Sequence, residues 1–322
     1  MIPEFDGVLI LGFGGPERHE DVIPFLENVL RGKNVPRERM LEVAEHYYHF
    51  GGRSPINEQN RELVRALEAE LARHGPALPV FWGNRNWHPM LADTLREMHR
   101  KGVRRALAYV TSAFGSYSGC RQYLEDIARV REQSGPETPE IEKLRTFSDH
   151  PGFLEAMTDR VRVALDRLPS AQLLFTAHSI PVAMAASSPY ERQLNAACAA
   201  VGAALGRADY RLVYQSRSGP PGQPWLEPDI LAALREIGSG DVVIAPIGFL
   251  SDHMEVLYDL DTEAARLCGE LGINMLRAGT VGAHPRFVRM IRELIVERVD
   301  GGVPAVCSED CCPPPRRPAA LR

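Results

Sequence analysis

Residues 7–17 read GVLILGFGGPE, and this stretch decides the fold class of the chain. A short apolar run that leads directly into glycines and a proline is typical of a buried parallel strand ending in a tight turn. The dinucleotide-binding fingerprint is excluded, because Glu17 stands where the third glycine belongs and Pro16 interrupts the turn. Two interpretations of residues 12–16 remain open. They form a tight strand-to-helix turn, or a loop whose missing side chains let a flat ligand approach the backbone.

Outward from this strand, short apolar runs alternate with segments of helical period, which is the pattern of parallel α/β sheets. We expect strands at 7–13, 79–83, 105–111 and 140–146, and again at 172–177, 210–215, 241–249 and 274–278. Helices are expected at 57–73, 152–167, 189–205, 227–237, 254–271 and 285–299. Four strands twice, at similar spacing, predict two similarly built domains, 1–150 and 151–300, with a cleft between them. A polar, proline-rich tail covers 301–322.

The bulk composition excludes several classes of protein. A chain of 322 residues is long enough for two domains, and its 42 acidic and 37 basic residues give a net charge of -5. No basic block covers a whole face, so nucleic acid is not an expected partner. The N-terminus lacks a positively charged leader, and no run of about 18 apolar residues occurs. We therefore expect a cytoplasmic protein with no transmembrane segment.

Ligands of such folds bind beyond the carboxyl ends of the strands, so residues that directly follow strands carry the most weight. His178 follows the strand at 172–177, and Glu255 lies just after the strand at 241–249. An imidazole and a carboxylate at adjacent strand ends suit Fe(II) and similar divalent metals, and the imidazole is also a base near neutral pH. The competing interpretation of His178 is a histidine that only bonds to neighbouring backbone.

For Glu255 the competing interpretation is a helix cap, because Asp252 as N-cap and Glu255 three residues on match a capping box. However, Glu255, Asp259 and Glu263 recur every four residues and so share one face of the expected helix. Like charges in a row cost stability unless they are solvated or shared with a cation. A surface acidic ridge and a metal-binding face therefore both remain open.

Five separated segments resemble the ferrochelatase family, in order and across almost the whole chain: LILGFGGPE, HFGGRSPIN, TAHSIP, YQSRSGPPGQPWLEPDI and APIGFLSDHMEVLYDLD. The motif sequences are most similar to those of the actinobacterial branch, whose members insert Fe(II) into coproporphyrin III to give coprohaem in haem biosynthesis. The resemblance implies two Rossmann-like, chelatase-type domains, each a four-stranded parallel sheet flanked by helices, with the active cleft between them. It implies coproporphyrin III and Fe²⁺ as substrates, and leaves open a transient contact with a membrane or a haem-pathway protein.

The resemblance also implies roles for individual residues. His178 and Glu255 match the family's paired iron ligands and are the expected catalytic residues. From the chemistry of the two groups, we expect His178 to be the main proton acceptor and Glu255 to help deliver iron and take the second proton. The positions of Ser54, Tyr123 and Phe13 match porphyrin contacts, although some relatives carry tyrosine in place of Phe13, and phenylalanine cannot ligate iron. Two further residues, Asp259 and Glu263, match an acidic ridge that is expected to guide the metal inward.

Three of the six cysteines crowd into the polar tail, where core packing does not explain them. Four thiolates are the usual complement for a [2Fe–2S] cluster, and Cys120 is the natural fourth ligand beside Cys307, Cys311 and Cys312. Many ferrochelatases that the chain resembles carry such a cluster, which implies a tail that packs back toward the first domain. Zinc on four cysteines and an unligated, redox-active tail are the alternatives.

Two alternative functions stay open beside insertion of iron into coproporphyrin III. The first is a ferrochelatase that uses protoporphyrin IX. The second is a porphyrin or haem carrier without catalysis, which needs an axial ligand but no paired carboxylate.

Overall fold

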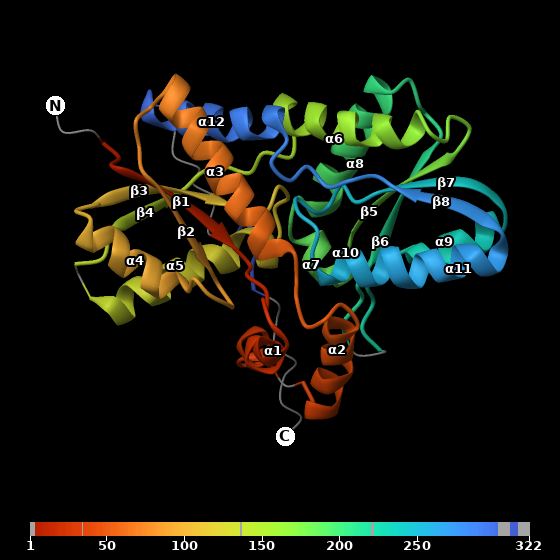
Figure 1. The fold of residues 1–322 in the computed structure, drawn as a ribbon, viewed down its shortest axis with the longest axis horizontal. Coiled ribbons are helices and arrows are strands. Elements are labelled where there is room, and N and C mark those ends of the chain that lie inside the picture. Colours follow the sequence, from red (N-terminus) through yellow and green to blue (C-terminus); the bar gives the residue numbers. More distant parts are fainter. Residues whose placement is uncertain (1–3, 34, 136, 220–221, 302–309, 315–322) are drawn as a thin grey trace.

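Two parallel four-stranded sheets form the centre of the computed structural model, which describes residues 4–33, 35–135, 137–219, 222–301 and 310–314 (Figure 1). The first sheet has the order β2-β1-β3-β4, with β1 (Gly7–Gly12), β2 (Val80–Asn84), β3 (Arg105–Val110) and β4 (Glu140–Lys143). The second has the order β6-β5-β7-β8, with β5 (Gln172–His178), β6 (Tyr210–Gln215), β7 (Gly240–Ala245) and β8 (Ile273–Arg277). The two orders are equivalent, which confirms the expected fold class. The domain boundaries stay a prediction.

The central strand of each sheet is buried along nearly its whole length, as a parallel strand covered on both faces must be. In β1 every residue is buried, and Leu9 pairs with Phe81 on one side and Ala108 on the other. In β5 only the first and last residues have appreciable exposure. Continuous apolar sequence therefore explains both strands.

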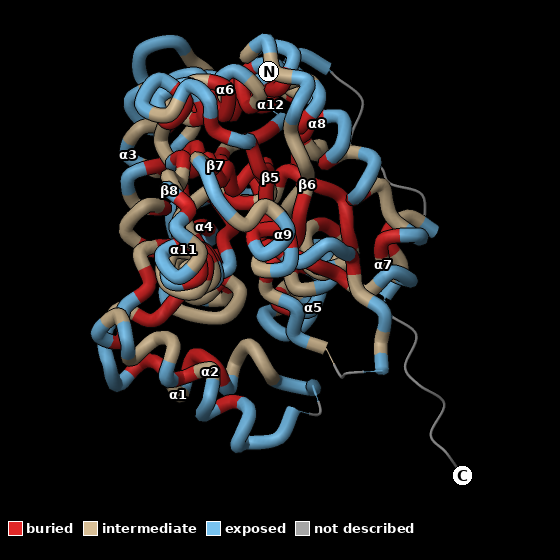
Figure 2. The backbone as a smooth tube through the Cα atoms, turned by 90° about the vertical axis from the view of Figure 1, so that its right-hand side faces the viewer, coloured by how far each residue is buried: buried red, intermediate tan, exposed pale blue. Residues whose placement is uncertain are grey.

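Helices cover both faces of the sheets, and buried residues lie along the strands between them (Figure 2). The longer helices are α1 (Val22–Leu30), α2 (Arg37–His49), α3 (Ile56–His74), α4 (Leu91–Arg100), α5 (Gln122–Ser134), α6 (Pro151–Leu165), α8 (Tyr190–Ala204), α9 (Ile230–Ile237) and α12 (Pro285–Val299). The short ones are η1 (His19–Asp21), α7 (Val182–Ala186), α10 (Met254–Tyr258) and α11 (Ala265–Leu271), together with two π-helical segments, η2 (Tyr117–Arg121) and η3 (Asp259–Ala264).

The last helix joins the two halves of the molecule. Helix α12 packs against α3 of the first half and α6 of the second (Figure 1). Its Phe287 contacts the rings of Tyr109, Phe147 and Phe153, all of them buried. These rings belong to one hydrophobic core that continues from beneath the first sheet to beneath the second.

Two expected elements differ from the structure. The strand expected at 241–249 ends at Ala245, because Pro246 has no N–H to donate to the sheet. The single helix expected at 254–271 is three segments, α10, η3 and α11, with the π-helical η3 in the middle. The remaining strands and most of the expected helices begin and end within one to three residues of their predicted limits.

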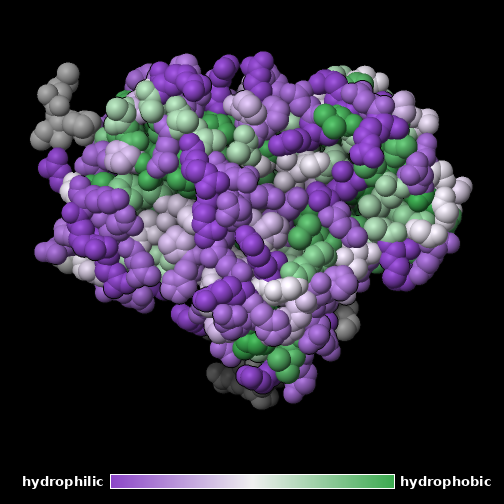
Figure 3. All heavy atoms as spheres, in the orientation of Figure 1, coloured by the Kyte–Doolittle hydropathy of each residue, from purple (hydrophilic) through white to green (hydrophobic). Residues whose placement is uncertain are grey.

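Helices α1 and α2 project from the body of the molecule, at the lower edge in Figure 1. They share a small hydrophobic cluster that includes Val22, Phe25 and Ala44. The face drawn in Figure 3 is mostly hydrophilic, with smaller hydrophobic patches that include one at this projecting end. None of the helices in the described part of the chain is long and apolar enough to cross a membrane.

Candidate active site

The structure brings His178 and Glu255 together. His178 is the last residue of β5, and Glu255 is the second residue of α10, in the loop and helix that follow β7. Because β5 and β7 are neighbours in the sheet and their connections leave in opposite directions, this is the topological switch point where such folds bind ligands. Nε2 of His178 lies 3.4 Å from Oε1 of Glu255. The two side chains can therefore share one metal ion or one proton.

The ring of His178 is held in one orientation. Its Nδ1 lies 2.5 Å from the carbonyl oxygen of Ser179. The backbone of the same residue is also held, because the carbonyl oxygen of His178 accepts a 2.9 Å hydrogen bond from the hydroxyl of Tyr190. Since a carbonyl oxygen only accepts, Nδ1 is the nitrogen that carries a proton in the neutral ring. Nε2 is left with its lone pair directed at the site, as a metal ligand or a base requires.

The two side chains shift each other's pKa. Desolvation lowers the pKa of His178, but the Glu255 carboxylate and the Ser179 carbonyl outweigh it and raise the pKa to about 8. Desolvation raises the pKa of Glu255, yet the neighbouring imidazole more than offsets this and holds that pKa well below its ordinary value. At neutral pH the pair is a protonated imidazole beside an ionised carboxylate.

His253 stands on the other side of Glu255. It is the N-cap of α10, where its Nδ1 accepts a 3.2 Å hydrogen bond from the backbone N–H of Glu255 and lies 4.0 Å from Oε2. The capping-box interpretation of Asp252 and Glu255 is therefore wrong, because His253 and not Asp252 caps the helix. Burial lowers the pKa of His253 and outweighs the opposing effect of the Glu255 carboxylate, so the neutral form of this ring is favoured. No sequence pattern pointed to His253 apart from its position in the same loop.

Asp259 lies one turn beyond Glu255 and joins the site through the end of β6. The hydroxyl of Ser216 donates a short hydrogen bond to its carboxylate, and Nε2 of Gln215 lies 3.3 Å from the same oxygen. Desolvation, together with the charges of Glu255 and Glu263, raises the pKa of Asp259 to about 7. Ser216 adopts φ 62°, a left-handed conformation that is strained for a serine. Gln215 is the last residue of β6 and Ser216 is the next residue, so both lie at a strand end, as His178 does.

Glu263 lies farther along η3, and its charge contributes to the raised pKa of Asp259. Burial and the charge of Asp229 raise its pKa. In the ranges that the structure describes, no group of three His, Cys, Asp or Glu side chains is arranged to hold a metal ion. Among the described residues, the candidate metal ligands are therefore the His178–Glu255 pair, with Asp259 next to it.

The three residues expected to contact porphyrin lie on the first half of the chain. Phe13, just after β1, is 37% exposed and meets Phe25 of α1 edge-on. Ser54 is buried, and its backbone N–H bonds to the carbonyl of Pro16 at the end of the glycine-rich loop. Tyr123 is also buried, with the guanidinium of Arg85 4.6 Å above its ring.

The glycines of that loop are needed by the protein's own packing. A Cβ on Gly12 would lie 2.5 Å from Oδ1 of Asn84, and Gly14 has φ 85° with Asn84 and the Trp87 backbone close by. These contacts favour the tight-turn interpretation of residues 12–16.

The cysteines fall into two groups. Cys198 and Cys268 are buried in hydrophobic clusters. Cys120 is buried in η2, and next to it Nε of Arg121 donates a 2.9 Å hydrogen bond to the carbonyl of Cys311. The sulfur atoms of Cys311 and Cys312 are 3.5 Å apart. The fourth expected ligand, Cys307, lies outside the described residues.

Comparison with solved structures supports the fold. The SirB protein from Bacillus subtilis, described with Fe³⁺, superposes with a TM-score of 0.59 at 11% identity, over 92% of this chain and 98% of that one. The sirohydrochlorin chelatase SirB from Bacillus subtilis subspecies spizizenii, in complex with cobalt, gives a TM-score of 0.56 at 10% identity. It covers 92% of this chain and 96% of its own. At these identities the likeness establishes the two-sheet architecture alone.

Sequence comparison is more specific. A protein named ferrochelatase from Rhodopirellula baltica is 54% identical over 98% of this chain and 96% of its own length. Proteins named coproporphyrin III ferrochelatase are 51% identical in Nocardia farcinica, over 98% of both chains, and 52% identical in Mycolicibacterium smegmatis, over 92% and 91%. The ferrochelatase family profile matches residues 5–299. The chain that carries His178 and Glu255 at its switch point therefore belongs to the ferrochelatase family.

Proposed function

We propose that this protein inserts Fe(II) into coproporphyrin III, with His178 and Glu255 as the residues that handle metal and protons. The observation that carries the proposal is the 3.4 Å approach of the His178 imidazole to the Glu255 carboxylate at the switch point of the second sheet. Relatives named coproporphyrin III ferrochelatase, at about half identity over nearly the full chain, favour this porphyrin.

Insertion replaces two pyrrole N–H protons of the porphyrin with one Fe²⁺, so the site must take up two protons. Nε2 of His178 accepts the first once its resting proton has left, because its pKa of about 8 makes it the stronger base of the pair. Glu255 was expected to accept the second, but its lowered pKa makes it a weak base and a better metal ligand. Asp259, with a pKa of about 7, suits the second proton better.

The four propionates of coproporphyrin require cationic and hydroxyl partners. Lys33 follows α1 and lies near enough to Glu255 that the two charges influence each other's pKa. Ser54 and the exposed ring of Phe13 lie on the same half of the molecule. We propose that this half binds the macrocycle while the second half delivers iron.

The test supplies anaerobic Fe(II) with coproporphyrin III or protoporphyrin IX and follows the absorbance of the metalloporphyrin. We expect turnover of coproporphyrin III, slower turnover of protoporphyrin IX, and loss of insertion in His178→Ala at an unchanged melting temperature. Equal or faster use of protoporphyrin IX contradicts the substrate. Tight porphyrin binding without insertion identifies a carrier instead.

We also propose that Cys120, Cys307, Cys311 and Cys312 hold a [2Fe–2S] cluster. Support comes from the hydrogen bond between Arg121 and Cys311, which brings the tail beside Cys120, and from the adjacent sulfurs of Cys311 and Cys312. When bound, such a cluster supplies a one-electron redox centre. Anaerobically purified protein should contain about two cluster irons per chain and lose them in Cys120→Ser but not in the control Cys198→Ser. Protein that contains one zinc per chain and no iron would instead show that the four cysteines bind zinc.

A further inference from the structure

The helical segment that carries the acidic side chains of the site depends on contacts from the rest of the molecule. Helix α10 has five residues and runs directly into the six-residue π-helix η3, which continues as α11. π-helical turns are rare, and most helical stability in proteins comes from tertiary packing. Contacts from outside the segment must therefore hold Glu255 and Asp259 where they are.

Arg277, the last residue of β8, supplies such contacts just before the segment and within it. Its Nη1 and Nη2 lie 3.1 and 3.3 Å from the two carboxylate oxygens of Asp252, just before α10. Its Nε and Nη2 lie 2.6 and 2.9 Å from the two oxygens of Asp261, inside η3. The guanidinium side chain is only 15% exposed. One planar cation therefore clamps two carboxylates that bracket Glu255 and Asp259.

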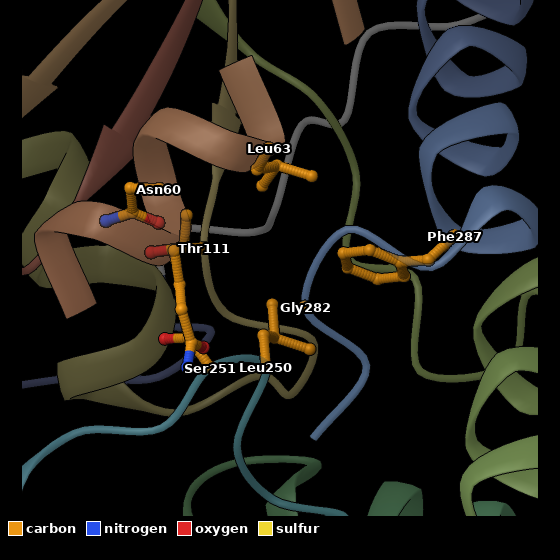
Figure 4. Close-up of a pocket in the computed structure, with 8 residues that line it drawn as sticks. Asn60, Leu63, Thr111, Leu250, Ser251, Gly282 and Phe287 are labelled. Atoms are coloured by element: carbon orange, nitrogen blue, oxygen red, sulfur yellow. The ribbon is translucent and has the colours of Figure 1, made fainter. Parts of the chain in front are cut away.

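The loop before α10 is held by two further bonds. Thr280 donates a 3.2 Å hydrogen bond to Asp252, and the backbone N–H of Asp252 donates a 2.9 Å bond to Oε1 of Gln59 in α3. Gln59 belongs to the first half of the chain, and it lines a cavity of about one water's size that also contacts Leu250 and Ser251. Figure 4 shows this seam, where α3 residues face the loop after β7. The Asp252 loop is thus fixed from both halves of the molecule.

The clamp divides four of the five acidic residues of 252–263 into two sets. Asp252 and Asp261 both pair with Arg277. Glu255 pairs with His178, and Asp259 bonds to Ser216 at the end of β6. Only the second set is directed toward the site.

We infer that Arg277 is a positioning residue for iron insertion: by clamping Asp252 and Asp261 it fixes Glu255 and Asp259 in the orientation that receives the metal. This inference rests on the proposed roles of Glu255 and Asp259. It requires the fork geometry of arginine, because a lysine ammonium is a single point charge that cannot bind both carboxylates in this bidentate manner.

The test compares Arg277→Gln and Arg277→Lys with the matched control Arg266→Gln, whose guanidinium pairs with Glu270 on the exposed surface of α11. We expect the KM for Fe(II) to rise about tenfold or more in both Arg277 variants, as removal of charge-assisted hydrogen bonds implies, with the KM for porphyrin unchanged. The control should keep both values. Full rescue by lysine, or an unchanged iron KM, overturns the inference.

Two further measurements separate the possible failures. If the Arg277 variants do not fold, Thr280→Val removes one bond to Asp252 without altering charge, and its iron KM should still rise about two- to fivefold; no rise there overturns the inference. Glu255→Gln in the same assay tests the proposed function itself. An inactive Glu255→Gln beside Arg277 variants with wild-type iron KM refutes only the clamp, whereas an active Glu255→Gln refutes the role of the site.

Discussion

Replacing Glu255 with Gln removes the negative charge that lies 3.4 Å from Nε2 of His178. That charge is the main reason why the pKa of His178 stands at about 8, because desolvation acts in the opposite direction. We therefore expect the His178 pKa in Glu255→Gln to fall below the ordinary value near 6.5, a drop of at least about 1.5 units. The imidazole would change from mostly protonated to mostly neutral at pH 7.

The assay is a pH titration of the His178 imidazole by NMR in isotope-labelled, metal-free protein, assigned by comparison with His178→Ala. Glu263→Gln is the matched control, since it removes a carboxylate from the same acidic face without touching His178. In this control the pKa of His178 should stay near 8. A His178 pKa that remains near 8 in Glu255→Gln would refute the reasoning that Glu255 controls the charge of the imidazole.

Three further outcomes are expected. Binding of Zn²⁺ as an inert probe should weaken about tenfold for each pH unit below 8, because the metal must displace the proton of His178, and calorimetry in buffers of different ionisation enthalpy measures the released proton. Ser216→Ala removes a hydrogen bond that lowers the pKa of Asp259, so that pKa should rise above 7 and the corresponding inflection of the pH–rate profile should move to higher pH. Phe287→Ala should lower the free energy of unfolding by about 3–5 kcal/mol, measured by denaturant titration, with an unchanged iron KM at 25 °C.

Sequence periodicity was sufficient for the sheets, because parallel strands buried on both faces need continuous apolar runs. It misplaced the end of β7, where the apolar run 246–249 continues past the strand although Pro246 cannot pair. It also merged 254–271 into one helix, because the period of apolar residues does not distinguish an α-helix from a π-helical insertion.

The site was predictable as far as residues stand directly after strands. That rule pointed to His178 and, applied to β6, would have pointed to Ser216, whereas Glu255 lies ten residues beyond the end of β7, in the helix after the loop. The same rule could not identify the residues that hold the site in place. Tyr190 bonds to the carbonyl of His178 and Gln59 to the backbone of Asp252, and no local sequence pattern predicts such long-range contacts. Asp252 shows the limit most clearly. Its sequence context favours a helix cap, but a buried guanidinium 25 residues later offers two charged hydrogen bonds, and His253 takes the cap position instead.

The equivalent topology of the two sheets places different residues at matching positions, which is consistent with the proposed division of metal and macrocycle binding between the two halves. Each sheet has a switch point between its two central strands, β1 and β3 in the first, β5 and β7 in the second. After β1 the chain offers only Phe13 and glycines held by packing, whereas after β5 it offers His178. A site that must strip protons from a flat, apolar ring and replace them with a cation needs both kinds of surface facing one another. Different residues at the ends of equivalent strands give the two switch points different chemistry.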